Sequence, residues 1–430
     1  MSTFEQLART ALLFQTDLGV PDPEVVLRAL TAPTILLVAG AEVASSLSGQ
    51  VAITTAAMLM ARSGHRVFID TPDAPLVGDQ PPLQGATLHD SIAAAGGSMI
   101  DGVQIALGCA LFPADIAFVF GGGSAGIGTR ARRTFSVGWT AWAGEVLEWP
   151  LRPAVALGPW PMGAMAAATL VACEALKVSG RILTRTSTHP GHFAELFAPA
   201  KRIIIRLASE DTPQIAQLGT LDIVSGGAVS HGMLYSLLRL PSISGRARIF
   251  EGDVSEPSNR NRNMLLLPEL VAHPKLEVFK RLKSGLTFES VQRHFVEADL
   301  PQLAERVAVG VDDIPTRWML AGANVSWMGV GATTHFSALA SVHYAYSACA
   351  ACLHPHDEDL EGPTPTVAPV SFLAGLMVAA NLLQDIAGDI RLASSSRFIT
   401  PLQPQGDWSS PVPPILGCPA HCPASRVRAA

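Results

Sequence analysis

The chain has 430 residues, 48% hydrophobic and only 15% charged, so it is long and apolar enough to form two or three globular domains. Its net charge is −6, with 30 basic against 36 acidic residues, and no stretch forms a basic face; we therefore expect no nucleic-acid partner. Six cysteines in a chain of this length do not indicate a secreted disulfide framework. The N-terminus lacks the apolar core of a signal peptide, and we expect a cytoplasmic protein.

The first half alternates apolar strands with helices. Helical sequence runs to about Leu30, and a nearly uncharged stretch follows from Thr34 to Ala61. Serines and threonines interrupt that stretch, which favours a buried strand, a turn and a buried helix over a membrane span. The predicted strands are 34–43, 65–70, 116–120 and 154–158, and an apolar helix follows at 162–177. Apolar strands alternating with helices predict a parallel sheet covered on both faces.

The second half repeats this order. After a joining strand at 202–208 come strands at 221–227, 247–253 and 306–313, with an apolar helix at 371–386. We therefore predict an α/β fold of two tandem Rossmann-like parallel-sheet domains, residues 1–210 and 211–430. An acidic, Pro-rich segment at about 353–370 predicts a mobile crossing loop, and 402–414 predicts another loop.

Polar residues gather after the predicted strands of the second half. Glu251 ends a strand, and Asp253 follows two residues later. A Ser-Asn-x-x-Arg run then holds Asn259 and Arg262, and Lys275 lies 13 residues beyond that arginine. Asp312 closes a later strand. The carboxyl ends of parallel strands are where an open α/β sheet binds its ligand.

The residue types in this set suit a nucleoside triphosphate. An acid at the tip of the second strand, here Glu251, suits a ribose hydroxyl. The amide and the two cations suit phosphate oxygens, and Asp312 suits Mg²⁺. Asn259 taken alone is better explained by a loop-capping role.

These residues resemble the ubiquitin-activating-enzyme-like adenylyltransferases, the family of ThiF, MoeB and the eukaryotic ubiquitin activators. The resemblance covers about residues 218–422. The family's acid-x-acid pair and Ser-Asn-x-x-Arg run match 251–262, its lysine matches Lys275, and its Asp-x-x-x-x-Arg run matches Asp312 and Arg317. By resemblance, Arg262, Lys275 and Asp312 are catalytic. The nucleotide-binding set is Gly227, Glu251, Asp253, Asn259, Arg262, Lys275 and Asp312.

The sequence departs from the family pattern in the first loop. The family's Gly-x-Gly-x-x-Gly is represented by Ser225 through Ser230, so only the middle glycine, Gly227, remains. A side chain at either outer position would crowd the approach of a phosphate to the backbone. The departure concerns ATP affinity and leaves the fold prediction unchanged.

The first half has no equivalent set. Asp70 ends its second strand, but no Asn-x-x-Arg run follows. We interpret this half as an inactive adenylation domain paired with an active one, as in ubiquitin activators. In this family the partner domain often supplies an arginine to the active site. Arg9 and Arg28 are the candidates by position, although each is also explained as an ordinary surface charge.

Four cysteines form two pairs near the C-terminus. Cys349 and Cys352 form Cys-x-x-Cys, and Cys418 and Cys422 form a wider pair. Together they predict a tetrahedral structural zinc that clips the crossing loop to the C-terminal end, with His354 or His421 as a substitute for one sulfur. Cys109 and Cys173 lie in apolar runs and are expected in the core.

The crossing loop contains no cysteine between residues 354 and 371. Family members that form a thioester keep one there, so we expect this chain to adenylate and to pass the acyl group directly to a partner's thiol. The alternative is that zinc is absent and Cys349 or Cys352 is the acceptor.

The resemblance implies an enzyme that uses Mg-ATP to adenylate the C-terminal carboxylate of a ubiquitin-like protein or peptide. A conjugating enzyme would be the next carrier, in a bacterial ubiquitin-like conjugation system associated with defence. A homodimer is left open. Two alternatives remain: a catalytically inactive ThiF-like binding scaffold, which the eroded glycine loop favours, and an NAD-dependent oxidoreductase, which leaves Asn259, Arg262 and Lys275 unexplained.

Overall fold

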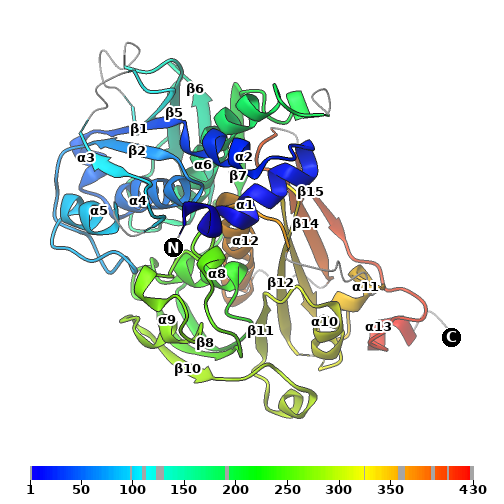
Figure 1. Cartoon of the computed structure of the whole chain (residues 1–430). Helices are drawn as coiled ribbons and strands as arrows, with labels where there is room; N and C mark the ends of the chain where they lie inside the picture. Colours follow the sequence, from blue (N-terminus) through cyan, green and yellow to red (C-terminus); the bar gives the residue numbers. More distant parts are fainter. Residues whose placement is uncertain are drawn as a thin grey trace.

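The computed structural model describes residues 2–96, 99–108, 113–122, 130–188, 193–323, 325–356, 364–388, 393–403 and 406–426. Its named strands form two sheets, one from each half of the chain (Figure 1). The long helices α6, α8 and α12 lie in the middle of the molecule, where α12 contacts both of the others.

The first sheet has seven strands in the order β3-β2-β1-β4-β5-β6-β7. Strands β1 to β5 run parallel, whereas β6 and β7 add antiparallel at one end. The strands are β1 (Thr34–Ala39), β2 (Arg66–Asp70), β3 (Ile105–Leu107), β4 (Ile116–Phe120), β5 (Thr134–Trp139), β6 (Ala143–Glu148) and β7 (Arg202–Arg206). The helices are α1 (Thr3–Leu18), α2 (Pro23–Thr31), α3 (Ala41–Ala44), α4 (Leu47–Arg62), α5 (Leu88–Gly96) and α6 (Met162–Leu183).

The second sheet has eight strands in the order β10-β9-β8-β11-β12-β13-β14-β15. Strands β8 to β12 run parallel, and β13 to β15 are antiparallel. The strands are β8 (Gln217–Val224), β9 (Ser244–Phe250), β10 (Leu286–Val291), β11 (Arg306–Val309), β12 (Trp327–Thr334), β13 (Ser337–Tyr344), β14 (Ser395–Ile399) and β15 (Asp407–Pro411). The α-helices are α8 (Ala228–Leu237), α9 (Glu277–Lys280), α10 (Ile314–Ala321), α11 (Ala350–Leu353), α12 (Ala368–Ile386) and α13 (Pro423–Arg426), and the 3₁₀ helices are η2 (Pro257–Asn259), η3 (Pro268–Leu270) and η4 (Glu297–Gln302).

The two sheets share one strand order, since the third, second, first and fourth strands of each half lie side by side in that sequence. The prediction of two tandem Rossmann-like α/β units is therefore confirmed. Each sheet is mixed rather than wholly parallel, because its last strands return antiparallel. The division expected at 210/211 falls in the segment between β7 and β8.

Two local expectations were wrong. Residues 154–158 form a single bridge from Val155 to Trp139 rather than a strand, and Pro150, Pro153 and Pro159 around them remove backbone donors. Residues 402–414 were expected to be loop, but β15 pairs with β14 at the edge of the second sheet. Its closing residue, Pro411, is tolerated because an edge strand needs donors on one side only.

Helix α1 begins and ends on clear local signals. The Ser2 hydroxyl accepts the N–H of Glu5, and the Glu5 carboxylate accepts the N–H of Ser2, which forms a capping box. Gly19 ends the helix with a φ of 62°, a conformation that glycine adopts without a Cβ penalty. The helix lies against the second half, where it contacts η2.

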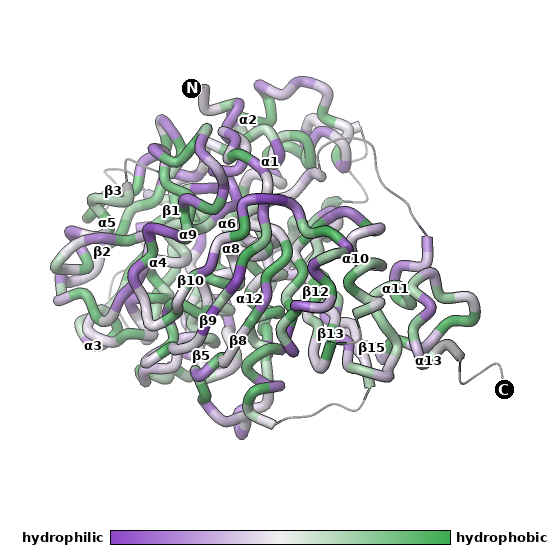
Figure 2. The backbone as a smooth tube through the Cα atoms, turned by 90° about the horizontal axis from the view of Figure 1, so that it is seen from below, coloured by the Kyte–Doolittle hydropathy of each residue, from purple (hydrophilic) through white to green (hydrophobic). Residues whose placement is uncertain are grey.

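The core is continuous between the halves. One cluster of buried side chains contains residues of α4 and α6 together with residues of α8 and α12, which are mostly green (hydrophobic) in Figure 2. Two helices, α6 and α12, are long and apolar enough to cross a membrane, but 94% and 83% of their most apolar windows are buried. Packing against neighbouring elements therefore accounts for their composition.

Helices α8 and α12 approach closely at Gly375. A Cβ on this residue would lie 2.3 Å from the Val229 oxygen and 2.5 Å from the Met233 nitrogen, both backbone atoms. We expect Gly375→Ala to lower the free energy of unfolding by about 1–3 kcal/mol, because overpacking forces the two helices apart. Chemical unfolding measures the change. Gly158→Ala, whose Cβ would meet nothing within 4 Å, is the matched control; equal stability of both variants would contradict the close approach.

Candidate functional site

A cavity of about 1340 Å³ opens where β8, β9 and β11 end. Its lining includes Ser225, Glu251 and Gly310, each of which follows the last residue of one of these strands. This is the edge of a parallel sheet at which open α/β folds bind ligands.

Every residue that the sequence assigned to nucleotide binding lines this one cavity. The set is Gly227, Glu251, Asp253, Asn259, Arg262, Lys275 and Asp312. These residues come from four separate segments spread over 86 positions of the sequence. Folding brings the four segments together around the cavity.

Glu251 is buried and holds the loops on both sides of it. Its carboxylate accepts the N–H of Gly226 at 2.8 Å and the N–H of Asp253 at 2.8 Å. The ammonium of Lys275 lies 3.4 Å from Glu251 and 2.7 Å from Asp253. The Asp253 side chain is 51% exposed, so it is the more accessible of the two acids.

His294 was missed by the sequence reasoning. Its Nε2 lies 3.4 Å from an Asp253 oxygen, and its ring occupies the space where a Cβ on Gly252 would lie. His294 follows β10 by three residues, but that strand was not predicted, so the rule that ligand-binding groups follow strands could not be applied to it. Glu251, Asp253 and His294 could hold a metal ion by proximity alone, but Lys275 already lies among these acids.

The first loop differs from a glycine-rich phosphate loop in its hydrogen bonding. Ser225, in place of the family's first glycine, has a φ of 91°, which costs a non-glycine residue about 1–2 kcal/mol. Its hydroxyl accepts the N–H of Gly227 at 3.0 Å. The backbone N–H groups of Gly226 and Gly227 are thus already bonded, to Glu251 and Ser225 respectively. The groups of this cavity that could bind phosphate are therefore mainly the cationic side chains in its lining.

Asn259 has the structural role that the sequence left open. Its side-chain oxygen accepts the N–H of Glu256 at 2.9 Å and caps η2. Next to it, the Arg262 guanidinium donates to the Ser258 carbonyl at 2.6 Å and to the Asn261 side-chain oxygen at 3.0 Å. Burial lowers the pKa of Arg262 to about 9, and the Arg9 charge adds to this effect. Arg262 therefore still carries its charge at neutral pH.

Arg9 reaches the cavity from α1, in the first half of the chain. Burial lowers its pKa, while the charges of Glu256 and Asp312 oppose that shift. Asp312 acts in the same sense on Arg262, so its carboxylate lies near two guanidinium groups. Arg28, the other candidate from the sequence, is exposed on α2 and is not part of this lining.

Arg317 is held by the segment that follows β11. Its guanidinium donates to the Val311 carbonyl at 2.9 and 2.6 Å, and only 5% of the residue is exposed. Asp313 caps α10 by accepting the N–H of Thr316 at 2.6 Å. The matched Asp-x-x-x-x-Arg run therefore serves to build the turn that presents Asp312 to the cavity.

At the corresponding edge of the first sheet, the described residues contact one another at two places. Arg130 pairs with Asp70 at 2.5 Å, at the end of β2. Gly121, which follows β4, lies so close to Val43 that a Cβ would be 2.5 Å from the valine methyl. Residues 123–129 lie outside the described residues, as do Cys109 and residues 357–363 of the expected crossing loop.

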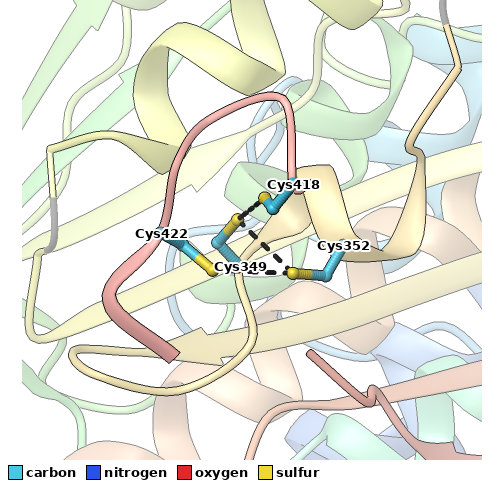
Figure 3. Close-up of side chains that lie close together, drawn as sticks. All are labelled: Cys349, Cys352, Cys418 and Cys422. Atoms are coloured by element: carbon cyan, nitrogen blue, oxygen red, sulfur yellow. Dashed lines mark hydrogen bonds between the residues drawn. The ribbon is translucent and has the colours of Figure 1, made fainter. Parts of the chain in front are cut away.

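The four paired cysteines form one buried cluster (Figure 3). The Sγ–Sγ distances are 4.0 Å for Cys349–Cys352, 3.5 Å for Cys349–Cys418 and 3.6 Å for Cys352–Cys422. Four sulfurs at the usual Zn–S distance around a tetrahedral zinc lie about 3.8 Å apart. Without an ion, burial raises the pKa of Cys352 to about 11, so metal binding there must displace thiol protons. The cluster fits a structural zinc; His354 and His421, both described residues, are not part of it.

Comparisons with known proteins give partial matches. A family model described as the BilD N-terminal domain matches residues 34–188, just over a third of the chain, from β1 to the turn after α6. No curated protein matches the sequence.

Among solved structures, Escherichia coli MccB with SeMet MccA is 15% identical, with a TM-score of 0.40, over 66% of this chain and 97% of that chain. SeMet PaaA is 13% identical, with a TM-score of 0.37, over 57% of this chain and 72% of that chain. These comparisons assign no substrate and no residue role.

His231, in α8 behind the cavity, gives the protein an acid-sensitive contact. Its Nδ1 accepts the Leu265 N–H at 3.2 Å, and burial, with the charges of Arg62 and Lys275, lowers the pKa of His231 to about 3. An unfolded histidine has a pKa of about 6.5, so as the pH falls the unfolded chain takes up this proton first. The contribution of neutral His231 to the free energy of unfolding is therefore fully present above about pH 6.5, and it is lost progressively as the pH falls toward 3.

We expect His231→Asn, which keeps an acceptor for Leu265, to reduce the acid sensitivity. The loss of unfolding free energy between pH 7 and pH 5 should be smaller by about 2 kcal/mol than in the wild type. Chemical unfolding at the two pH values measures it. His273→Asn, at an exposed position, should leave the pH dependence unchanged; an unchanged dependence in His231→Asn would contradict the assignment.

Proposed function

We propose that this protein is an ATP-dependent adenylyltransferase that activates the C-terminal carboxylate of a ubiquitin-like protein or peptide. The observation that carries the proposal is the single cavity that gathers all seven residues expected from the motifs. Under this proposal residues 211–430 form the active adenylation domain, and residues 1–210 form an inactive partner domain that supplies Arg9.

Under this proposal, different side chains bind the ribose, the phosphates and the metal ion of Mg-ATP. Asp253, with Glu251 behind it, faces the ribose, while Arg262, Lys275 and Arg9 neutralise the phosphates. Asp312 would hold Mg²⁺, since its carboxylate lines the cavity beside the cations. The metal ion would neutralise phosphate charge.

The reaction needs positioning and charge neutralisation rather than a protein nucleophile. A carboxylate oxygen of the substrate attacks the α-phosphorus, the bond from that phosphorus to the bridging oxygen breaks, and pyrophosphate leaves with the electron pair. Arg262 and Lys275 stabilise the charge that builds on the phosphate oxygens.

The cavity has room for the second reactant. Ligand pockets for small molecules measure about 300–1,000 Å³, and this one is larger. Beyond the charged groups its lining continues over the second sheet with small or uncharged residues. They are Gly331, Ala332, Thr333, Thr334, Leu339 and Phe398. An extended chain end placed over these strands would bring its carboxylate to the phosphates.

The acyl group would pass to a thiol on a partner, such as a conjugating enzyme. Among the described residues, Cys173 is buried in α6 and the other four cysteines form the clip. If zinc holds those four, the described part of the chain offers no accessible thiol. This supports adenylation followed by direct transfer.

The test is ATP–pyrophosphate exchange by the purified full chain with the cognate ubiquitin-like protein, together with calorimetry using Mg-ATP. The proposal expects Mg-ATP to bind and exchange to depend on the substrate's free carboxylate. A substrate with an amidated C-terminus is the control. If Mg-ATP gives no heat of binding and no exchange occurs, the protein is a binding scaffold. The first loop is also compatible with a scaffold, because its N–H groups at 226 and 227 are already hydrogen-bonded within the protein.

A further inference from the structure

Arg62 is a buried cation at the junction of the two halves. It ends α4, has no exposed surface, and faces three backbone carbonyls of the other half. Its guanidinium donates to the Arg260 oxygen, to the Met264 oxygen at 3.2 Å and to the Leu266 oxygen at 3.0 Å. Those carbonyls flank Arg262 on both sides, in the loop that carries the Ser-Asn-x-x-Arg run.

The same loop reaches back into the first half. The Arg260 side chain, 2% exposed, pairs with Asp101 at 3.0 Å. The Asn261 side chain donates to the Thr10 hydroxyl at 3.0 Å, and its oxygen accepts from Arg262 at 3.0 Å. Thr10 therefore orients Asn261, and Asn261 orients the Arg262 guanidinium.

Charge–charge attraction does not explain why Arg62 is buried at this junction. Burial lowers the pKa of Arg62 to about 9, and the nearby Arg260 charge pushes in the same direction. A buried arginine with a like charge beside it is costly, and what offsets the cost here is a set of carbonyl acceptors whose positions the guanidinium fork defines. Such a contact fixes the backbone path of the loop.

We propose that Arg62 and Thr10, both in the first half, are positioning residues for Arg262 in the second half. The inference rests on the proposed function, since Arg262 is the phosphate-binding group of that function. Arg62 holds the loop backbone, and Thr10 acts through Asn261 on the guanidinium. The half without a nucleotide motif thus shapes the nucleotide site of its partner.

The test uses three full-length variants. Arg62→Met removes the guanidinium, Thr10→Val removes one hydroxyl at nearly constant shape, and Arg66→Met is the control. Arg66 lies four residues from Arg62 but donates to Ala32 of its own half. Calorimetry with Mg-ATP gives affinity, thermal unfolding without nucleotide gives stability, and hydrogen exchange by mass spectrometry reports on amides 256–266.

We expect Arg62→Met to weaken Mg-ATP binding by about 10- to 100-fold, the range associated with a misplaced binding group, and to speed exchange in the loop. Thr10→Val should weaken binding several-fold with nearly wild-type thermal stability. Arg66→Met should match the wild type in affinity and loop exchange. Lower thermal stability with unchanged affinity in Arg62→Met would mean a merely structural role and would overturn the inference.

If Arg62→Met does not fold, Thr10→Val decides: wild-type affinity in that variant overturns the inference. Failure of the wild type to bind Mg-ATP overturns the proposed function, and the inference falls with it. A wild type that binds while both variants bind equally well overturns the inference alone.

Discussion

Asp312→Asn is expected to lower the rate of ATP–pyrophosphate exchange by about 10²–10³-fold, the usual effect of removing one charge-stabilising group from an active site. The carboxylate lines the cavity beside Arg9 and Arg262, where a divalent ion would find its ligand. The amide keeps the shape of the side chain and loses its charge. Exchange rates measured across a range of Mg²⁺ concentrations should show that the variant needs more Mg²⁺ for half-maximal rate.

Asp313→Asn is the matched control, because it changes the neighbouring carboxylate in the same way. Asp313 caps α10, and asparagine is an equally good cap, so helix and activity should be largely retained. An inactive Asp313→Asn beside an active Asp312→Asn would move the metal ligand by one residue and contradict the assignment.

Loss of zinc is expected to have the largest effect on stability. Structural zinc sites bind with apparent free energies of about 10–16 kcal/mol in small peptides, and that energy is coupled to folding. Here the four cysteines belong to a second core cluster that also contains Leu320, Met328 and Val412. We expect the wild type to contain one zinc per chain, and Cys349→Ser to lose it, unfold at a lower temperature and become sensitive to proteolysis at 412–426.

Cys173→Ala tests whether the effect comes from the clip. This cysteine is buried in α6, and its replacement should leave the zinc content unchanged. A wild type purified without zinc, or a Cys349→Ser variant that retains it, would contradict the metal assignment. In that event the alternative of an acyl acceptor at Cys349 or Cys352 would be examined by trapping a thioester.

The candidate site could be predicted because its residues sit at strand ends in spaced motifs. Glu251 follows β9, and Asp312 follows β11 by three residues, and parallel strands bring those ends to one edge. Lys275 depends on the resemblance, since it lies outside any strand, yet it reaches the same acids. The clustering of the four cysteines could also be predicted from the sequence, because the spacing within each pair is typical of zinc ligands.

Several features of the site were not predictable from local patterns. His294 has no motif around it, and its place beside Asp253 depends on the course of the chain after β10. The fold holds further strands that were missed, β5, β6, β12 and β13, and the sheet turns antiparallel at the pairs β5–β6 and β12–β13, which apolar runs alone do not reveal.

Local chemistry was enough to specify the α/β architecture, the duplicated order, the acid and cation set and the paired cysteines, since each depends on neighbours along the chain. The packing of the two halves decided which of those groups act together. Arg62 and Thr10 lie about 200 and 250 residues from the loop they hold, and no periodicity or spacing connects them to it. Such contacts arise because burying a common core brings distant backbone carbonyls within reach of a guanidinium, which only the folded chain can arrange.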